Sequence, residues 1–219
     1  MSASENRADA ALRARLERLS SSGVGDASGK RRILDTGIHR LVGSGTFAGR
    51  AVTARCDEGS VSAVLRALAE CEPGAVLVAH GPGEWAYFGE LTGADAVRSG
   101  TVAVVVDGLV RDLERLGTLR LHLFARGLTP RGASPPGGGE VNVPVRIGGV
   151  EVRPGDWLVG DVDGIAVLGQ DEIEAVTVRG EEIAAAESAC FERVLGGESL
   201  LEQPYQDGRR LAEHVQRGG

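Results

Sequence analysis

Hydrophobic and polar positions alternate along the middle of this chain with two different periods. Residues 61–68 place valine, alanine and leucine at helical spacing behind Ser60, which is a suitable N-cap residue. The apolar run at 75–79 follows and has the length and the flanking turn residues of a buried strand. Strand and helix patterns alternate in this way from about residue 50 to residue 125. The alternation predicts an α/β fold in which parallel strands are joined by crossover helices.

The clearest strand pattern is the run Val102 to Val106. It is β-branched and lies between Gly100 and the pair Asp107-Gly108, so it predicts a buried strand that ends in a tight turn. Arg111 and Asp112 come just past the end of this strand. Loops that buried strands hold in place commonly carry ligand-binding residues.

The second half of the chain is rich in strand patterns. Alternating segments at 141–145 and 150–152 flank Gly148-Gly149, which is a strong signal for a hairpin turn. Two further strands are predicted at 157–159 and 165–168. This half therefore adds a β-rich part to the α/β core.

Both ends of the chain show helical patterns. Residues 8–19 place leucines in a narrow stripe among arginines. A long polar helical pattern occupies the stretch from residue 172 to about residue 201, and the helix is expected to end near Gly196-Gly197. We predict one domain, residues 1–219, in which residues 1–18 form an N-terminal helix and residues 172–219 a C-terminal helical tail. The tail is expected to pack on its own domain or on a neighbouring subunit.

Composition narrows the class of protein. Apolar residues make up 42% of the 219 residues and charged residues 25%, as in ordinary globular proteins. The net charge of −7 disfavours broad binding to nucleic acid, which needs a basic face. The three cysteines form no CxxC pair, and no stretch approaches the roughly 18 apolar residues of a membrane span. We expect a cytoplasmic protein that binds neither nucleic acid nor membrane.

One constellation carries candidate chemistry. Glu90 is separated by 20 residues from the pair Arg111 and Asp112. Arginine offers a planar cation with five donors, and aspartate offers hard oxygen ligands, so a carboxylate substrate with a divalent ion would use both. By itself, an Arg-Asp pair after a turn is more typical of solvated side chains that start a helix. Glu90 and its surroundings favour the functional interpretation.

Several segments together resemble one known family. They keep the same order and similar spacing over roughly residues 19–203, and they are LSSSGVGDA (19–27), GIHRLVGSGTFAGRAVTARC (37–56), GELTGADAVRSGTVAVVVDGLVRD (89–112), FARGLTPRG (124–132) and PGDWLVGDVDGIAVL (154–168). The chain resembles the 4-hydroxy-4-methyl-2-oxoglutarate/4-carboxy-4-hydroxy-2-oxoadipate aldolase family, which also contains the regulator of ribonuclease activity A. The resemblance implies a compact α/β domain with a β-rich core flanked by helices. It also implies a homotrimer or hexamer with active sites at subunit boundaries.

The resemblance further implies roles for individual residues. Enzymes of this family are class II aldolases that use Mg²⁺ or Mn²⁺ and carry an acidic residue, 20 spacers and then Arg-Asp, which Glu90, Arg111 and Asp112 match. Asp112 would hold the metal directly and Glu90 would reach it through water, because Mg²⁺ keeps several waters. Arg111 would bind the pyruvyl carboxylate or the enolate oxygen. The backbone N–H groups of Leu91 and Thr92 would bind the substrate carboxylate.

The general base is left open between a water polarised by Glu90 and a carboxylate from a neighbouring subunit. Glu187 is our candidate for the carboxylate that the neighbouring subunit supplies, and it would also act on the metal through water. The alternative is that Glu187 is only a solvated glutamate on an acidic helix. The family usually has a leucine and an alanine where this chain has Thr92 and Gly93, and often an acid where it has Arg115. Substrate range is therefore open at these positions.

The expected function is a metal-dependent aldolase that cleaves a 4-hydroxy-2-oxo acid of the 4-hydroxy-4-methyl-2-oxoglutarate type to pyruvate through a metal-stabilised enolate. Oxaloacetate decarboxylation is the expected side activity, because loss of CO₂ leaves the same enolate. The alternative is a non-enzymatic regulator that binds a ribonuclease or another protein. The regulator branch lacks the aspartate after the arginine, so Asp112 favours catalysis.

Other residues have ordinary explanations beside functional ones. Asp107 is expected to start a turn, and His80 to line the pocket rather than bind zinc, since no second histidine or cysteine stands at ligand spacing. Arg126 and Arg131 would bind a second substrate carboxylate or hold the structure together. The glycine-rich segment 43–49 lacks a phosphate-loop pattern and is expected to be a turn.

Overall fold

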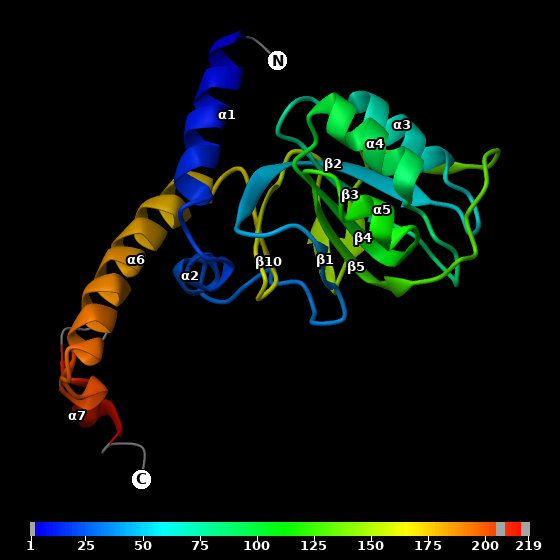
Figure 1. Ribbon diagram of the computed structural model, residues 1–219. Coiled ribbons are helices and arrows are strands. Elements are labelled where there is room, and N and C mark those ends of the chain that lie inside the picture. Colours follow the sequence, from blue (N-terminus) through cyan, green and yellow to red (C-terminus); the bar gives the residue numbers. More distant parts are fainter. Residues whose placement is uncertain (1–2, 205–208, 216–219) are drawn as a thin grey trace.

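The computed structural model describes residues 3–204 and 209–215 and places most of the chain around one curled mixed sheet (Figure 1). Its strands are β1 His39–Val42, β2 Phe47–Cys56, β3 Val76–His80, β4 Ala103–Val110, β5 His122–Leu128, β6 Gly139–Val141, β9 Trp157–Gly160 and β10 Ile165–Leu168. Their order is β1-β5-β4-β3-β2-β9-β10, and β6 pairs with β2 off this path. A separate hairpin consists of β7 Val145–Ile147 and β8 Val150–Val152.

Helices cover the sheet and extend from it at one side. They are α1 Ala3–Leu16, α2 Ser21–Ala27, α3 Ser62–Glu70, α4 Glu90–Ser99, α5 Leu113–Leu116, α6 Ile173–Leu195, α7 Leu211–Val215 and the 3₁₀ helix η1 Leu200–Glu202. In Figure 1, α3, α4 and α5 lie together over the body, whereas α6 runs away from it. The part of the chain that the structure describes contains no helix with the length and apolar character needed to cross a membrane.

The centre of the sheet is built from parallel crossover units. Strands β2, β3, β4 and β5 pair in parallel, and α3, α4 and α5 are the connections between them. This confirms the predicted α/β fold. Because the four strands run in one direction, the loops after their carboxyl ends meet at one edge of the sheet, which is where ligands bind in open α/β sheets.

The run 103–106 in β4 is apolar throughout because both of its faces are buried. Val104 and Val106 pack in the layer between the sheet and the helices, together with Val64 and Leu68 of α3. Val105 packs on the opposite side, in the layer closed by the β7–β8 hairpin. A strand with two buried faces does not show the alternation of polar and apolar residues that a surface strand has. The continuous apolar run therefore predicted that this strand lies in the core.

The predicted turn at Asp107-Gly108 is wrong. Strand β4 continues to Val110, with an irregular register between Val106 and Leu109. Glycine is needed at 108 because an added Cβ would lie 2.5 Å from the carbonyl oxygen of Gly81, the residue that follows β3. The chain thus passes close to its neighbour instead of turning. Arg111 and Asp112 still follow the end of the strand directly.

Two other predicted boundaries are corrected and one is confirmed. Helix α3 begins at Ser62 with Val61 as its N-cap, and Ser60 accepts only a long hydrogen bond, 3.3 Å, from the N–H of Ser62. The strand predicted at 141–145 is divided between β6 and β7, since Asn142 takes a positive φ of 55°. The long helix α6 ends at Leu195 with Gly196 as its C-cap, which confirms the end predicted near Gly196-Gly197.

The two terminal helices are joined by charge. Arg15 of α1 donates to Glu174 at 2.7 Å and to Glu181 at 2.9 Å, both on α6. Leu16 is fully buried with Trp157 of β9, so the leucine stripe of the N-terminal helix packs on its own domain. The first half of α6 also packs on α2. Residues 205–208 and 216–219 of the predicted tail lie outside the described residues.

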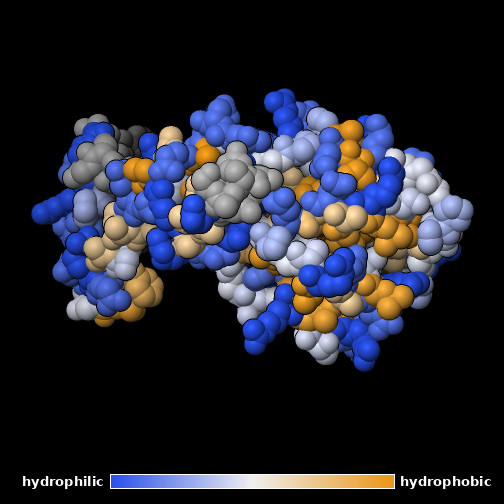
Figure 2. Space-filling model, turned by 90° about the horizontal axis from the view of Figure 1, so that it is seen from above, coloured by the Kyte–Doolittle hydropathy of each residue, from blue (hydrophilic) through white to orange (hydrophobic). Residues whose placement is uncertain are grey.

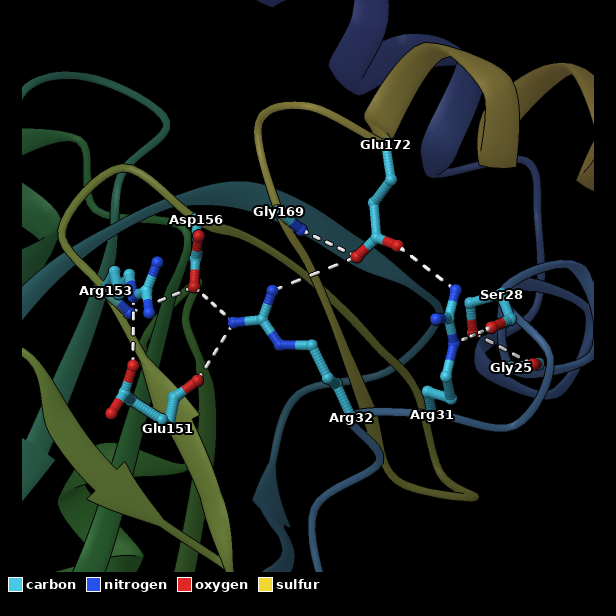
Figure 3. A network of polar contacts seen from close by, with 9 residues as sticks. All are labelled: Gly25, Ser28, Arg31, Arg32, Glu151, Arg153, Asp156, Gly169 and Glu172. Carbon is cyan, nitrogen blue, oxygen red and sulfur yellow. Dashed lines mark hydrogen bonds and ion pairs between the residues drawn. The ribbon is translucent and has the colours of Figure 1, made fainter.

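A polar network anchors the start of α6 (Figure 3). Glu172 accepts the N–H of Gly169 at 3.0 Å and lies 3.7 Å from the guanidinium of Arg31 and 3.9 Å from that of Arg32. Arg32 also pairs with the carboxylate of Asp156, which is buried. The network therefore fixes the direction in which α6 leaves the body.

Hydrophobic side chains reach the surface in two regions when the molecule is seen from above (Figure 2). One lies on the projecting helix α6, where Phe191 is 62% exposed. The other lies over α3 and α4, where Leu65 is 41% and Leu91 79% exposed. Leu91 is at the start of α4, at the edge of the sheet where the parallel strands have their carboxyl ends.

Candidate functional site

The loop before α4 brings Glu90 to the end of β4. Residues 86–88 run beside the strand end: the N–H of Tyr87 donates to the carbonyl of Leu109 at 2.9 Å, and the N–H of Arg111 donates to the carbonyl of Phe88 at 2.9 Å. Tyr87 and Phe88 are buried, which holds this segment in place. The β3–α4–β4 crossover therefore brings Glu90 close to Arg111 and Asp112, although 20 residues separate them in the sequence.

Asp112 joins the two elements. One carboxylate oxygen, Oδ2, accepts the backbone N–H of Glu90 at 3.1 Å and lies 3.3 Å from Nε of Arg111. Asp112 precedes α5 as its N-cap residue, yet its side chain does not cap that helix and serves the start of α4 instead. Its backbone is left-handed, with φ 60° and ψ 37°. Aspartate tolerates this conformation better than most residues, and such strain is commonly kept at functional positions.

Two glycines make room for this arrangement. A Cβ at Gly89 would lie 2.6 Å from Oδ2 of Asp112 and 3.1 Å from Cγ of Arg111. A Cβ at Gly132 would overlap the guanidinium of Arg111, which therefore rests against the bare backbone there. Sequence reasoning identified the arginine and the aspartate but not these glycines, whose only sequence signal is their identity.

A shallow pocket opens beside the arginine. Its volume is about 320 Å³. It is lined by Arg111, Asp112 and Leu113 at the end of β4 and by residues 128–130 at the end of β5 and just after it. The side chain of Arg111 is 46% exposed and that of Asp112 33% exposed. A small anion can therefore reach both groups from solvent.

Helix α4 presents its N-terminus at the same place. The backbone N–H of Gly89 donates to the hydroxyl of Thr92 at 2.9 Å, and the N–H of Gly93 donates to the carbonyl of Gly89 at 2.8 Å. The Thr92 hydroxyl is thus used for capping, which leaves only its backbone for the predicted substrate role. A helix start carries partial positive charge and favours a bound carboxylate.

Glu90 has a partner that the sequence did not suggest. Nε of Arg115 donates to Oε2 of Glu90 at 3.1 Å, and both side chains are largely open to solvent. The four charged groups of the site, on Glu90, Arg111, Asp112 and Arg115, therefore form a balanced set of two carboxylates and two guanidiniums.

The donor set suits a hydrated hard cation and excludes a protein cage. Within residues 3–204 and 209–215, no three histidine, cysteine, aspartate or glutamate side chains converge as metal ligands. Mg²⁺ commonly takes one or two carboxylates and keeps several waters, so Asp112 with Glu90 nearby fits Mg²⁺ or Mn²⁺. Zinc, which takes three or four protein ligands, does not fit this set.

Glu187 is not brought to this site within one chain. It is exposed on α6, which Figure 1 shows on the side of the body away from α4 and α5. The predicted role of Glu187 thus requires another subunit, and it stays a prediction.

Two of the remaining candidates, Asp107 and Arg126, lie on the other face of the sheet. Asp107 accepts the N–H of Gly148 at 2.8 Å and pairs with Arg126, which also donates to Asp35 at 3.0 Å. Asp107 and Arg126 therefore hold the β7–β8 hairpin and the loop at residue 35 against the sheet, and they do not face the pocket at Arg111. The Arg126 guanidinium lowers the pKa of the Asp35 carboxyl below its ordinary value by hydrogen bonding.

His80 and Arg131 do not join the pocket at Arg111 either. His80 lies beside Asp107 in the register of β3 and β4 and lines a separate cavity with Arg55 and Arg146. The guanidinium of Arg131 lies over the ring of Trp85, 5.4 Å from its centroid. The prediction that His80 lines the pocket is therefore wrong for this site, since its side chain faces the hairpin side of the sheet.

Fold and site together define a class: an α/β domain that gathers a carboxylate, an arginine and a helix N-terminus at the carboxyl edge of its parallel strands. Residues 9–167 match the model of the RraA-like family, described as Aldolase/RraA. Since that match covers most of the chain, this protein belongs to the Aldolase/RraA family, as its sequence predicted.

Individual relatives fall into two groups by name. A Halalkalibacterium halodurans protein named provisionally as a 4-hydroxy-4-methyl-2-oxoglutarate aldolase is 33% identical over 186 residues, which cover 82% of this chain and 89% of that protein. The solved structure of the RNA-processing inhibitor RraA from Thermus thermophilus is 34% identical, with a TM-score of 0.63, over 68% of this chain and 91% of that one. The Streptomyces coelicolor RraAS2 structure, an unusual member of the RNase ES inhibitor RraA family, is 28% identical, with a TM-score of 0.75, over 84% and 98%.

Proposed function

We propose that this protein is a carbon–carbon lyase that cleaves a 4-hydroxy-2-oxo acid of the 4-hydroxy-4-methyl-2-oxoglutarate type to pyruvate with Mg²⁺ or Mn²⁺. The observation that carries the proposal is the shared position of Asp112, Arg111 and the start of α4 at one edge of the sheet. The aldolase names of relatives such as the one from H. halodurans support the same reaction class.

Arg111 and the start of α4 bind the 2-oxo acid end of the substrate. The guanidinium of Arg111 forms charge-assisted hydrogen bonds with the carboxylate or with the oxygen that gains charge as the bond breaks. The N–H groups of Leu91 and Thr92 offer further donors at the positive end of the helix. Together these groups orient the 2-oxo acid before the reaction.

Asp112 would hold the cation with a carboxylate oxygen. When bound, Mg²⁺ or Mn²⁺ supplies Lewis-acid stabilisation of the negative charge that develops on the pyruvyl oxygen. Glu90 lies beside Asp112, and we assign it to accept the proton of the 4-hydroxyl group through a water molecule. Oxaloacetate loses CO₂ to leave the same enolate, so we propose its decarboxylation as a side activity.

We also propose assembly as a trimer or a pair of trimers. Leu128, which is 52% exposed, lines the open pocket, and Leu91, which is 79% exposed, lies at the start of α4. A neighbouring copy would bury both leucines. Such a copy could bring Glu187 to the site. Light scattering of the full chain measures the assembly, and Glu187→Gln should lower turnover without changing the assembly if this role is correct.

Pyruvate release, coupled to lactate dehydrogenase, tests the reaction. Turnover of 4-hydroxy-4-methyl-2-oxoglutarate and of oxaloacetate should require Mg²⁺ or Mn²⁺, stop with EDTA, and fall about 100-fold or more in Asp112→Asn. Arg111→Lys should raise KM because lysine cannot form the paired hydrogen bonds of a guanidinium. Wild-type inactivity on both substrates with either metal would refute the proposal.

A second candidate is a regulator that binds a ribonuclease, which the relatives from T. thermophilus and S. coelicolor favour. In that case Asp112→Asn would not change the inhibition of a ribonuclease, since the shallow site would not be the binding surface. A ribonuclease assay with wild type and Asp112→Asn distinguishes this function from the lyase reaction.

A further inference from the structure

Arg115 lies where it can control the candidate site. It belongs to the short helix α5, which follows Asp112 directly, and its guanidinium reaches back across 25 residues to Glu90. Its carbonyl accepts the N–H of Thr118 at 3.1 Å and the Thr118 hydroxyl at 2.8 Å, so the backbone that carries the side chain is fixed. The side chain itself is 79% exposed, against 44% for that of Glu90.

The charges of the site limit what can enter it. With Arg115 in place, the two carboxylates of Glu90 and Asp112 are balanced by the two guanidiniums. A divalent cation bound at Asp112 would have to approach the charge of Arg115 and compete with it for Glu90. An exposed ion pair is weak, so this exchange is possible without disturbing the fold.

A doubly negative ligand changes the balance. A divalent cation and a dianion together add no net charge, so the two restore the neutrality that the cation alone would disturb. The cation and the dianion are therefore expected to bind together more readily than the cation alone.

Resting on the proposed function, we infer that Arg115 is a positioning residue that makes cation and dianion binding interdependent. Without a ligand it occupies Glu90 and weakens cation binding. When a dianionic substrate enters, its two charges offset those of the cation. The site consequently disfavours a cation held without substrate.

Binding of Mn²⁺ alone, and of Mn²⁺ with oxalate, tests this inference on the full chain. Free Mn²⁺ is measured by electron paramagnetic resonance, and oxalate serves as a planar dianion with the shape of the pyruvate enolate. Arg115→Gln should tighten binding of Mn²⁺ alone about three- to tenfold, the order of magnitude that Coulomb's law gives for removing one positive charge from the neighbourhood of a divalent cation in water. It should also reduce the tightening caused by oxalate by a similar factor.

The chain offers a matched control. Arg98 on α4 makes a similar exposed ion pair, with Asp95 at 2.7 Å. It lies in the last turn of α4, whereas Glu90 of the candidate site lies in the first turn. Arg98→Gln also removes one positive charge from a helix that covers the sheet. It should leave the affinity for Mn²⁺ unchanged, both without and with oxalate. Asp112→Asn should abolish the binding and identify the site.

The outcomes separate the inference from the proposed function. Equal Mn²⁺ affinity in Arg115→Gln and Arg98→Gln would overturn the inference even if the wild type is an active lyase. Absence of Asp112-dependent Mn²⁺ binding in the wild type would overturn both. A third outcome is that Arg115→Gln binds Mn²⁺ more tightly while the wild type turns over neither 2-oxo acid. This outcome would support the role of Arg115 and would count only against the lyase reaction.

Discussion

Gly89 provides the most direct test of the site's geometry. Its φ of −158° and ψ of −166° describe extended backbone that alanine can also adopt, so Gly89→Ala adds a methyl group without backbone strain. The new Cβ would lie 2.6 Å from Oδ2 of Asp112, whereas contacts below 3.0 Å are essentially never seen and ordinary contact begins at 3.4 Å. The Asp112 carboxylate must therefore move by about 0.4 to 0.8 Å.

This displacement should affect catalysis far more than folding. A misplacement of 1 Å can cost about 100-fold in rate, so a shift of about 0.4 to 0.8 Å predicts a loss of about 6- to 40-fold in kcat/KM for pyruvate release. The moving group is a side chain that is 33% exposed, so the clash is relieved at the surface and not in the core. We expect Tm to fall by no more than about 4 °C, which corresponds to roughly 1 kcal/mol for a chain of this size.

Gly127→Ala is the matched control. An added Cβ there would lie 3.5 Å from Cδ2 of Leu109, an ordinary contact, although Gly127 is on the neighbouring strand β5. This variant should keep wild-type turnover and Tm. Full activity in Gly89→Ala would refute the reasoning, and so would a loss of activity that is matched in Gly127→Ala or explained by unfolding of the protein at the assay temperature.

Three further predictions concern the rest of the chain. Burial raises the pKa of the Cys56 thiol to about 12, so a maleimide at pH 8 should label the partly exposed Cys190 and leave Cys56 unmodified until denaturant is added, as mass spectrometry of digests can show. Burial lowers the pKa of His122 below its ordinary 6.5, so the unfolded chain binds the proton more readily than the folded chain. The free energy of unfolding should therefore decrease as the pH falls below 6.5. In urea titrations between pH 7 and pH 5, His122→Phe should show a smaller decrease than the wild type. Leu77→Ala empties a fully buried position between the sheet and the helices and should lower the free energy of unfolding by about 2–5 kcal/mol, while an unchanged urea midpoint would contradict the packing described for β3.

Sequence patterns located most of the core strands and the crossover helices. Their apolar runs and helical spacings follow directly from which faces are buried, and burial is the dominant local signal. The error at Gly108 has a tertiary origin. Gly108 was interpreted as a turn residue, but glycine there permits the close approach of β4 to Gly81, the residue that follows β3, which no local pattern reveals.

The candidate site was predicted in part. The 20-residue spacing indicated Glu90, Arg111 and Asp112, and the structure places the backbone N–H of Glu90 3.1 Å from the Asp112 carboxylate. The pairing of Glu90 with Arg115 was not predicted, because it depends on the direction in which α5 leaves the strand end.

The sequence by itself determined the alternation of strands and helices, the family and the identities of the acidic and basic groups that face one edge of the sheet. Each of these depends on side-chain chemistry and on periods of a few residues. Only the tertiary structure decided that the Asp112 side chain caps the start of α4, that glycines 89 and 132 leave space beside it, and that Glu187 lies away from the site. These features depend on how segments far apart in the chain pack against one another. No local sequence pattern predicts contact distances to within a few tenths of an ångström.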